Sequence, residues 1–128
     1  MTGVRVLVIE DNPINLELMT YLLEAFGHVA GSAADGEEGI RAALDDPPDV
    51  VLCDLELPRK SGVEVLEALR CDPRLDRVPI IAVTASAMAG DRERLLAEGF
   101  DGYISKPIAP ERFVAEVEEY ARRKHGRS

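Results

Sequence analysis

The sequence is poor in residues on which several classes of protein depend. It contains two cysteines, two histidines and no tryptophan among its 128 residues. Cys53 and Cys71 do not stand at the spacing of a metal-ligand pair, so we expect two reduced thiols, Cys53 buried in an apolar run and Cys71 in a polar stretch. His28 and His125 are both predicted to be surface residues with no phosphodonor role. The sequence therefore offers neither a disulfide framework nor a cysteine–histidine metal site.

Long apolar runs and positive charge are also scarce. No run approaches the roughly 20 apolar residues that span a bilayer, and the first residues lead into a strand-like segment rather than a signal peptide. We therefore expect a cytoplasmic protein with no membrane association. The chain has 15 Lys and Arg against 24 Asp and Glu, a net charge of −9, whereas nucleic-acid binders need a basic footprint. No nucleic-acid partner is expected, and the basic cluster at 122–124 is predicted to be a solubilising tail.

Five short apolar runs alternate with five segments of helical periodicity along the chain. A serine–glutamate capping box at 61–64 and prolines near the helix starts and stops support this division. The strands are predicted at 4–9, 28–33, 49–53, 79–83 and 103–104. The helices are predicted at 14–25, 35–44, 61–69, around Leu95 to Gly99, and from Pro110 to 121.

The runs at 4–9, 49–53 and 79–83 are almost continuously apolar rather than alternating. That pattern is typical of parallel strands whose two faces are both covered. Five strand–helix units with right-handed crossovers predict a doubly wound five-stranded α/β sandwich. A chain of 128 residues has room for one core, so we expect one domain over residues 1–128. Ligands of such sheets bind at the carboxyl ends of the strands.

Polar side chains follow four of the five predicted strands. Glu10 and Asp11 follow the first, Asp54 ends the third, Thr84 the fourth and Lys106 the fifth. In a parallel sheet these positions share one edge, where two carboxylates about 4 Å apart repel by roughly 4 kcal/mol at an effective dielectric near 20. A lysine and a hard cation such as Mg²⁺ offset such repulsion. A carboxylate nucleophile with a metal, a lysine and a hydroxyl is the set that phosphoryl transfer to aspartate needs.

Each of these residues also has a purely structural interpretation. Glu10 and Asp11 could cap the first helix, because acids favour helix N-termini. Asp54 could be an ordinary polar residue at a strand end, Thr84 suits a strand by itself, and Lys106 could face solvent. The convergence of all five at one edge favours the functional interpretation.

The segments that carry these residues resemble a known family. The stretches 8–12 (VIEDN), 52–58 (LCDLELP), 82–85 (AVTA) and 103–107 (YISKP) are similar to the signature segments of response-regulator receiver domains, the phosphorylatable modules of two-component signalling. The similarity covers the whole chain in the right order and spacing. It is greatest to stand-alone, single-domain receivers that relay cell-cycle and developmental signals in bacteria.

The resemblance implies a role for each acid. Asp54 would accept the phosphoryl group. Asp11, Asp54 and the backbone carbonyl of Glu56 would ligate Mg²⁺ directly, and Glu10 would act mostly through water. Glu10 stands where many receivers have aspartate, so the reach of the outer metal shell would differ. Glu56 would lie close enough to the phosphoryl group to alter the rate of self-dephosphorylation.

The resemblance also implies a switch and its partners. Lys106 would pair with the phosphoryl oxygens and form a cis peptide with Pro107, while Thr84 and Tyr103 would move on phosphorylation and change the face formed by the fourth helix, fifth strand and last helix. The fold would be flavodoxin-like, with strand order 2-1-3-4-5. The chain would be a signalling module in a phosphorelay rather than an enzyme, with no output domain. A histidine kinase or a histidine phosphotransfer protein would supply phosphoryl groups, and a downstream protein target would read the result.

Three other readings stay open at this point. An aspartate-nucleophile phosphatase of the haloacid dehalogenase type also uses an acid, Mg²⁺ and a lysine, but its nucleophile normally ends the first strand, whereas Asp54 ends the third. A degenerate receiver would bind partners without phosphorylation, although the chemical set here is complete. The chain could also be a domain excised from a hybrid kinase.

Overall fold

The elements follow the apolar runs of the sequence. The computed structural model describes residues 3–85 and 90–125, with side chains as far as Arg123. The described residues form five strands, β1 (Arg5–Ile9), β2 (Val29–Ala33), β3 (Val50–Asp54), β4 (Ile80–Thr84) and β5 (Gly102–Ser105). They also form five α-helices, α1 (Pro13–Ala25), α2 (Gly36–Asp45), α3 (Gly62–Arg70), α4 (Asp91–Glu98) and α5 (Pro110–His125). A single 3₁₀ turn, Pro73–Leu75, was not predicted.

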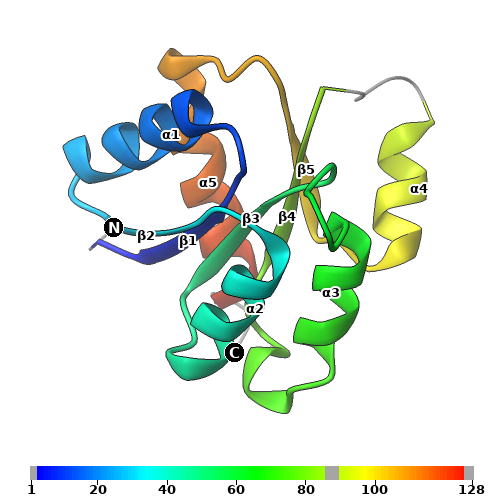
Figure 1. Ribbon diagram of the computed structural model, residues 1–128. Coiled ribbons are helices and arrows are strands. Elements are labelled where there is room, and N and C mark those ends of the chain that lie inside the picture. The colour runs from blue at the N-terminus through cyan, green and yellow to red at the C-terminus, as the bar shows by residue number, and fades with distance from the viewer. Residues whose placement is uncertain (1–2, 86–89, 126–128) are drawn as a thin grey trace.

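All strand pairs are parallel, and the order is β2-β1-β3-β4-β5. The doubly wound sheet, the flavodoxin-like order and the five strand–helix units predicted from the sequence are thus confirmed. Helices α1 and α5 cover one face and α2 and α3 the other, while α4 lies next to β5 and adds Leu95 to the core layer of the α2 and α3 face (Figure 1). No helix of residues 3–85 and 90–125 combines the length and the apolar character that a membrane span needs.

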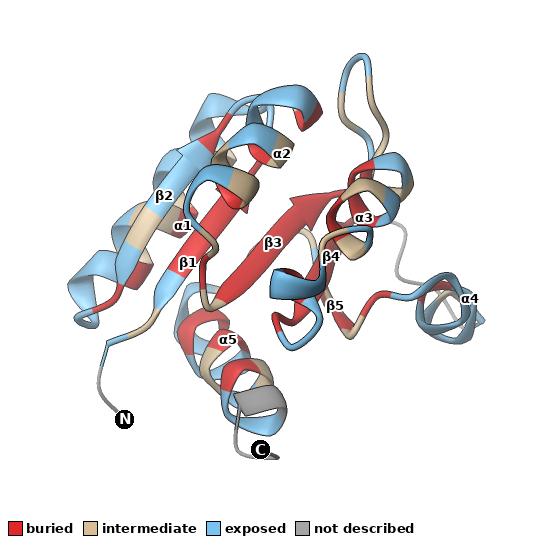
Figure 2. Cartoon of the chain, turned by 90° about the horizontal axis from the view of Figure 1, so that it is seen from below, coloured by how far each residue is buried: buried red, intermediate tan, exposed pale blue. Residues whose placement is uncertain are grey.

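The core lies in two layers, one on each face of the sheet. Side chains alternate between faces along each strand, so Leu7 and Ile9 pack toward α2 and α3 while Val6 and Val8 pack toward α1 and α5. Every residue of β3 and β4 is buried, as Figure 2 shows for β3. The prediction that the continuously apolar runs are strands covered on both faces is therefore confirmed for β3 and β4. The edge strand β2 is mostly exposed, which explains its weaker sequence signal.

Helix starts are fixed by side-chain caps. The Asn12 side chain accepts hydrogen bonds from the backbone N–H groups of Ile14 and Asn15 at the start of α1. Ser61 and Glu64 form the predicted capping box of α3. Such caps stabilise a helix by about 1 kcal/mol each. Asn12, rather than Glu10 or Asp11, therefore performs the capping that the structural interpretation assigned to the two acids.

Polar side chains at the amino ends of the strands are tied to the backbone. Asp49 Oδ2 accepts from the Arg5 N–H at 2.8 Å, and Asp101 Oδ2 accepts from the Ile80 N–H at 2.8 Å while pairing with Arg70 at 2.6 Å. These carboxylates supply acceptors for strand-end N–H groups that a cross-strand partner would otherwise satisfy.

The prediction of a surface position for His28 is wrong. His28 is 5% exposed. Its Nδ1 accepts from the Val4 N–H at 3.0 Å, so the proton stands on Nε2, which lies 2.6 Å from Glu118 Oε2 on α5. This pairing joins residues 90 apart in sequence, a distance at which no local pattern could have indicated it. The side chain of His125 lies outside the described residues.

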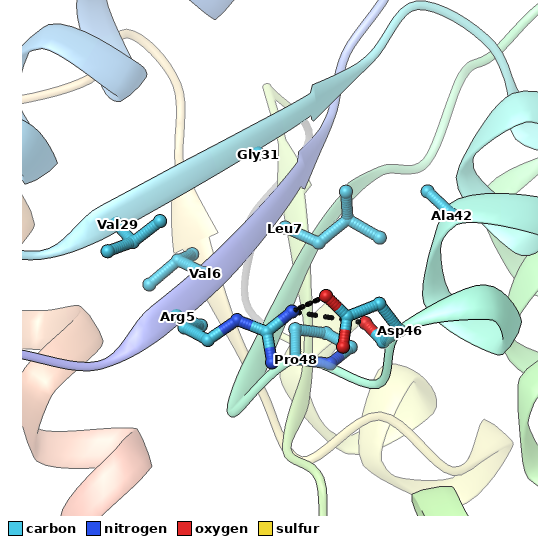
Figure 3. Close-up of a pocket in the computed structure, with 8 residues that line it drawn as sticks. All are labelled: Arg5, Val6, Leu7, Val29, Gly31, Ala42, Asp46 and Pro48. Carbon is cyan, nitrogen blue, oxygen red and sulfur yellow. Dashed lines mark hydrogen bonds and ion pairs between the residues drawn. The ribbon is translucent and has the colours of Figure 1, made fainter.

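A shallow apolar hollow of about 250 Å³ also lies at the amino ends of β1 and β2 (Figure 3). Leu7, Val29 and Pro48 line it, and the ion pair between Arg5 and Asp46, at 2.5 Å, crosses its rim. No carboxylate of the site predicted from the sequence lines this hollow.

Candidate functional site

Three carboxylates converge where β1 and β3 end. The two strands are neighbours, with Ile9 opposite Cys53, so the residues that follow, Glu10 and Asp54, also lie side by side. Oxygens of Glu10, Asp11 and Asp54 all lie within 4.8 Å of one another. Parallel pairing therefore brings together acids that are more than 40 positions apart, as the sequence predicted.

Lys106 reaches the same cluster from the far side of β4. Its Nζ lies 3.0 Å from Glu10 Oε1 and 3.1 Å from Asp54 Oδ2. Its backbone N–H donates to the Thr84 carbonyl at 2.9 Å, which continues the pairing of β5 with β4. Burial opposes the charge of the ammonium group, but the carboxylates of Glu10 and Asp54 together outweigh it and raise the pKa of Lys106. The ammonium is thus a permanent charge at neutral pH.

Glu10 is the most buried acid of the cluster. It is 1% exposed, and its Oε2 accepts from the Asn12 N–H at 3.1 Å. Its Oε1 faces Lys106 at ion-pair distance but has no hydrogen bond of acceptable geometry. Burial first, and then the neighbouring Asp54 carboxyl, raise the pKa of Glu10 against the opposing influence of Lys106 and the Asn12 N–H. A buried oxygen without a hydrogen bond is costly, and a bound cation would remove that cost.

Asp54 lies at the centre of the site. It is 5% exposed, and its Oδ1 accepts from the Glu56 N–H at 3.0 Å while Oδ2 contacts Lys106. One strand away, Thr84 ends β4 and is also 5% exposed. Thr84 and Glu56 line a hollow of about 240 Å³ between the loop after β3 and α4. Asp54 therefore has a hydroxyl-bearing residue one strand away and open volume at the loop that follows it.

Gly62 is part of the site's framework, although the sequence singled it out only as part of a helix start. A Cβ on Gly62 would lie 2.8 Å from the Asp54 carbonyl oxygen and from Leu55 Cα. Only glycine lets α3 begin this close to the backbone that carries Asp54. The sequence shows a glycine next to the capping serine. The need for glycine at this position arises from its contact with the backbone after β3, which no local pattern reveals.

The end of β5 carries the remaining residues predicted for the site. The Lys106–Pro107 peptide bond is cis. Tyr103 is half-buried, and its N–H and carbonyl each lie 3.3 Å from the hydroxyl of Tyr120 on α5. Gly102 makes room for this contact, since a Cβ there would lie 2.2 Å from the Tyr120 ring. No sequence pattern indicated Tyr120, because nothing local links it to β5.

The donor set fits a hard divalent cation. It consists of carboxylate oxygens, includes one buried oxygen without a hydrogen bond, and contains no sulfur or imidazole ligand, a composition that suits Mg²⁺ better than zinc or copper. Cys53 is adjacent in sequence but is no ligand candidate. Burial raises the pKa of its thiol far above the ordinary range, and its Sγ donates to the Asp54 carbonyl.

Comparison with known proteins agrees with this geometry. Residues 6–118 match the family model described as "Response regulator receiver domain". The chain is 42% identical over 115 residues to the polar-differentiation response regulator DivK of Brucella anthropi and to that of Brucella ovis, covering 90% of this chain and 94% of each relative.

Two solved structures share the fold. The chemotaxis response regulator CheY4 of Vibrio cholerae superimposes with a TM-score of 0.88 at 25% identity, covering 93% of this chain and 99% of that one. The receiver domain of the sensor histidine kinase PA1611 from Pseudomonas aeruginosa PAO1, which holds a magnesium ion in its active-site cleft, superimposes with a TM-score of 0.82 at 34% identity, covering 98% and 99%. A family match over most of the sequence, joined to the acids and lysine at the strand ends, shows that this chain belongs to the response regulator receiver domains of two-component signalling.

Proposed function

We propose that Asp54 takes the phosphoryl group in this receiver, and that a histidine kinase or a histidine phosphotransfer protein donates it. The observation that carries the proposal is the contact of a buried Asp54 carboxylate with Lys106. In the transfer, an Asp54 carboxylate oxygen forms a bond to phosphorus as the bond from phosphorus to the donor's imidazole nitrogen breaks. The imidazole then leaves with the electron pair.

The residues around Asp54 would each serve this step. The Lys106 ammonium balances negative charge on the phosphoryl oxygens, and the hydroxyl of Thr84 is suited to donate a hydrogen bond to one of them. The Glu56 N–H, 3.0 Å from Asp54 Oδ1, orients the acceptor carboxylate. Glu10 keeps the ammonium near the site before the phosphoryl group arrives.

The same proposal includes Mg²⁺ as the cofactor. Glu10, Asp11, Asp54 and the backbone carbonyl of Glu56 would hold it, Glu10 mostly through water. Bound there, the ion supplies positive charge for the oxygens of the transferred group. The solved relative with magnesium in its cleft supports the assignment.

We further propose that the phosphoryl group acts as a switch rather than as a step of catalytic turnover. Lys106 and Thr84 would turn toward the added charge, and Tyr103 would follow, which changes the face formed by α4, β5 and α5. A downstream protein would read that face. Since such a relay draws its phosphoryl groups from ATP, the proposal also assigns the chain to the cytoplasm.

A phosphatase that uses an aspartate nucleophile is the second candidate, because it would share the acid, the metal and the lysine. It would release phosphate from many ester molecules, whereas this chain should take up one phosphoryl group per molecule. Neither the position of Asp54 at the end of the third strand nor the family match favours the phosphatase.

Labelling with acetyl phosphate in the presence of Mg²⁺ tests the proposal. Mass spectrometry should detect one added phosphoryl group per chain, hydroxylamine should remove it as it removes acyl phosphates, and Asp54→Asn should abolish it. Asp49→Asn is the matched control, an aspartate change at the opposite edge of the sheet, and should label normally. Labelling that survives in Asp54→Asn, or that resists hydroxylamine, would refute the assignment.

A further inference from the structure

The face formed by α4, β5 and α5 contains a defined pocket, here named the β5 pocket. Its volume is about 290 Å³, and its lining includes Arg92 from α4, Tyr103 from β5, and Arg112, Glu116 and Tyr120 from α5. Polar atoms dominate the lining, unlike the hollow at the amino ends of β1 and β2 in Figure 3. The pocket thus joins the three elements that the proposed switch would move.

The charged residues that line the β5 pocket are mostly positive, whereas the protein as a whole is negative. The chain carries a net charge of −9, yet two arginines and one glutamate line this pocket. Neither Arg92 nor Arg112 forms an ion pair or a side-chain hydrogen bond with any residue that the structure describes. Glu116 is one turn from Arg112 on α5 and is likewise unpaired among the described residues. Two guanidinium groups are therefore free to receive an acceptor from outside.

A second pair of arginines on the surface shows the opposite arrangement. Arg41 and Arg59 line a hollow of about 330 Å³ together with Asp35, Glu37 and Glu38. Arg59 is already paired with Asp35 at 2.7 Å, and acids outnumber arginines in that lining. An anion approaching this hollow meets neighbouring carboxylates, whereas one approaching the β5 pocket meets an excess of positive charge.

The backbone of β5 is closed to a partner at the same place. β5 is an edge strand, and an exposed strand edge is a template for pairing with another chain. Here the Tyr120 hydroxyl lies 3.3 Å from both the N–H and the carbonyl of Tyr103 and occupies both groups. Recognition at this position must therefore use side chains rather than an added strand.

We propose that the β5 pocket receives a carboxylate side chain of a protein partner, held by Arg92 and Arg112. The planar guanidinium group binds carboxylates in a two-pronged manner, and Tyr103 and Tyr120 offer ring surface to the aliphatic part of an aspartate or glutamate. A nucleic acid is a poor occupant, because its long chain of phosphates would be repelled by the other acids of the protein. This inference deepens the proposed function, since it names the chemistry of the partner that reads the switch.

The test uses the ¹⁵N-labelled protein and an acetylated, amidated peptide of six glutamates, titrated while NMR shifts are followed. The shifts should centre on Tyr103 and the side-chain N–H groups of Arg92 and Arg112. Arg92→Gln with Arg112→Gln should weaken binding at least tenfold. Arg41 lines the acidic hollow and has no ion pair with any described residue. Arg41→Gln should leave the affinity within about twofold, in line with the small effects of isolated surface charges.

Three results would overturn the inference. The first is shifts centred on Arg41 and Arg59, the second is equal binding of a six-glutamine peptide, and the third is full displacement of the peptide by inorganic phosphate at matched ionic strength. The proposed function is tested separately, by labelling the same samples with acetyl phosphate. A wild-type protein that labels but does not bind the peptide contradicts the pocket alone, while one that binds but does not label contradicts Asp54 as acceptor.

Discussion

The two edges of the sheet use the same kinds of residue in opposite ways. At the amino ends of the strands, Asp49 and Asp101 accept hydrogen bonds from strand N–H groups, and Asp101 also has an arginine partner. At the carboxyl ends, Glu10, Asp11 and Asp54 crowd together with one lysine, and a buried Glu10 oxygen lacks a hydrogen bond. The amino edge ties its acids to donors of the protein, whereas the carboxyl edge leaves one buried Glu10 oxygen without a hydrogen bond and, among the described residues, the Asp11 carboxylate without a partner.

This contrast distinguishes the acids that complete the fold from the acids of the candidate site better than burial does. Buried or half-buried acids occur at both edges, and so do ion pairs. What differs is whether each carboxylate oxygen faces donors that the fold itself supplies. A charge cluster that the fold does not neutralise lowers stability and is retained where it serves chemistry.

The largest predicted effect on stability belongs to the amino edge. Asp101→Ala removes the acceptor of the Ile80 N–H and the partner of Arg70, so the free energy of unfolding should fall by about 2–3 kcal/mol. Urea denaturation measures this loss, and Asp54 should still label with acetyl phosphate. Loss of labelling in the folded variant would show that the two edges are not independent.

A smaller effect of opposite sign is expected at the carboxyl edge. Burial and the nearby Asp54 raise the pKa of Glu10 above its ordinary value of 4.5, so the folded protein favours a neutral group there. Glu10→Gln should therefore raise the free energy of unfolding at pH 7 when divalent metal is chelated. Urea denaturation in EDTA measures the gain, and a loss of stability would contradict the unfavourable environment assigned to Glu10.

The raised pKa of Glu10 also predicts how the stability of the wild-type protein depends on pH. A carboxyl whose folded pKa is raised destabilises the fold above that pKa, and this penalty disappears as the pH falls toward the unfolded value of 4.5. Without metal, the difference in stability between Glu10→Gln and the wild type should therefore shrink as the pH falls from 7 toward 4.5.

The smallest effect concerns Asp35, the N-cap of α2. The Glu38 N–H first, and then Arg59, lower the pKa of Asp35 below its ordinary value of 3.8. A carboxyl with a lowered folded pKa stabilises the fold above its unfolded pKa and loses that contribution as the pH falls through the folded pKa. Asp35→Asn should therefore flatten the stability curve slightly below about pH 4, as acid titration followed by circular dichroism would detect. A stability curve steeper in Asp35→Asn than in the wild type would contradict the predicted direction of the effect.

The sequence predicted the sheet, and the convergence of Glu10, Asp11, Asp54 and Lys106 at one edge of it, because both depend on local patterns. Continuous apolar runs identify buried parallel strands such as β3 and β4, and the residue that follows each strand must lie at the carboxyl edge. Asp54 and Lys106 could therefore be placed together although 52 positions separate them.

What the sequence could not predict depends on contacts between distant elements. His28 looked like a surface residue because its partner, Glu118, lies on the last helix. The contact of Tyr120 with Tyr103 and the room that Gly102 makes for it follow from how α5 lies along β5. Such pairings leave no periodicity or spacing in the chain that could be read beforehand.

We infer that the carboxyl edge, and not the amino edge, is built to bind a cation. Asp11 tests it most directly, because this exposed residue makes no side-chain hydrogen bond or ion pair with the residues described here, so Asp11→Asn should leave the fold intact. Mg²⁺ at ten times its dissociation constant should raise the free energy of unfolding of the wild type and of the amino-edge control Asp49→Asn by about 1.4 kcal/mol. Asp11→Asn should lose most of that gain. Equal stabilisation of all three proteins by Mg²⁺, or of none, would contradict the account.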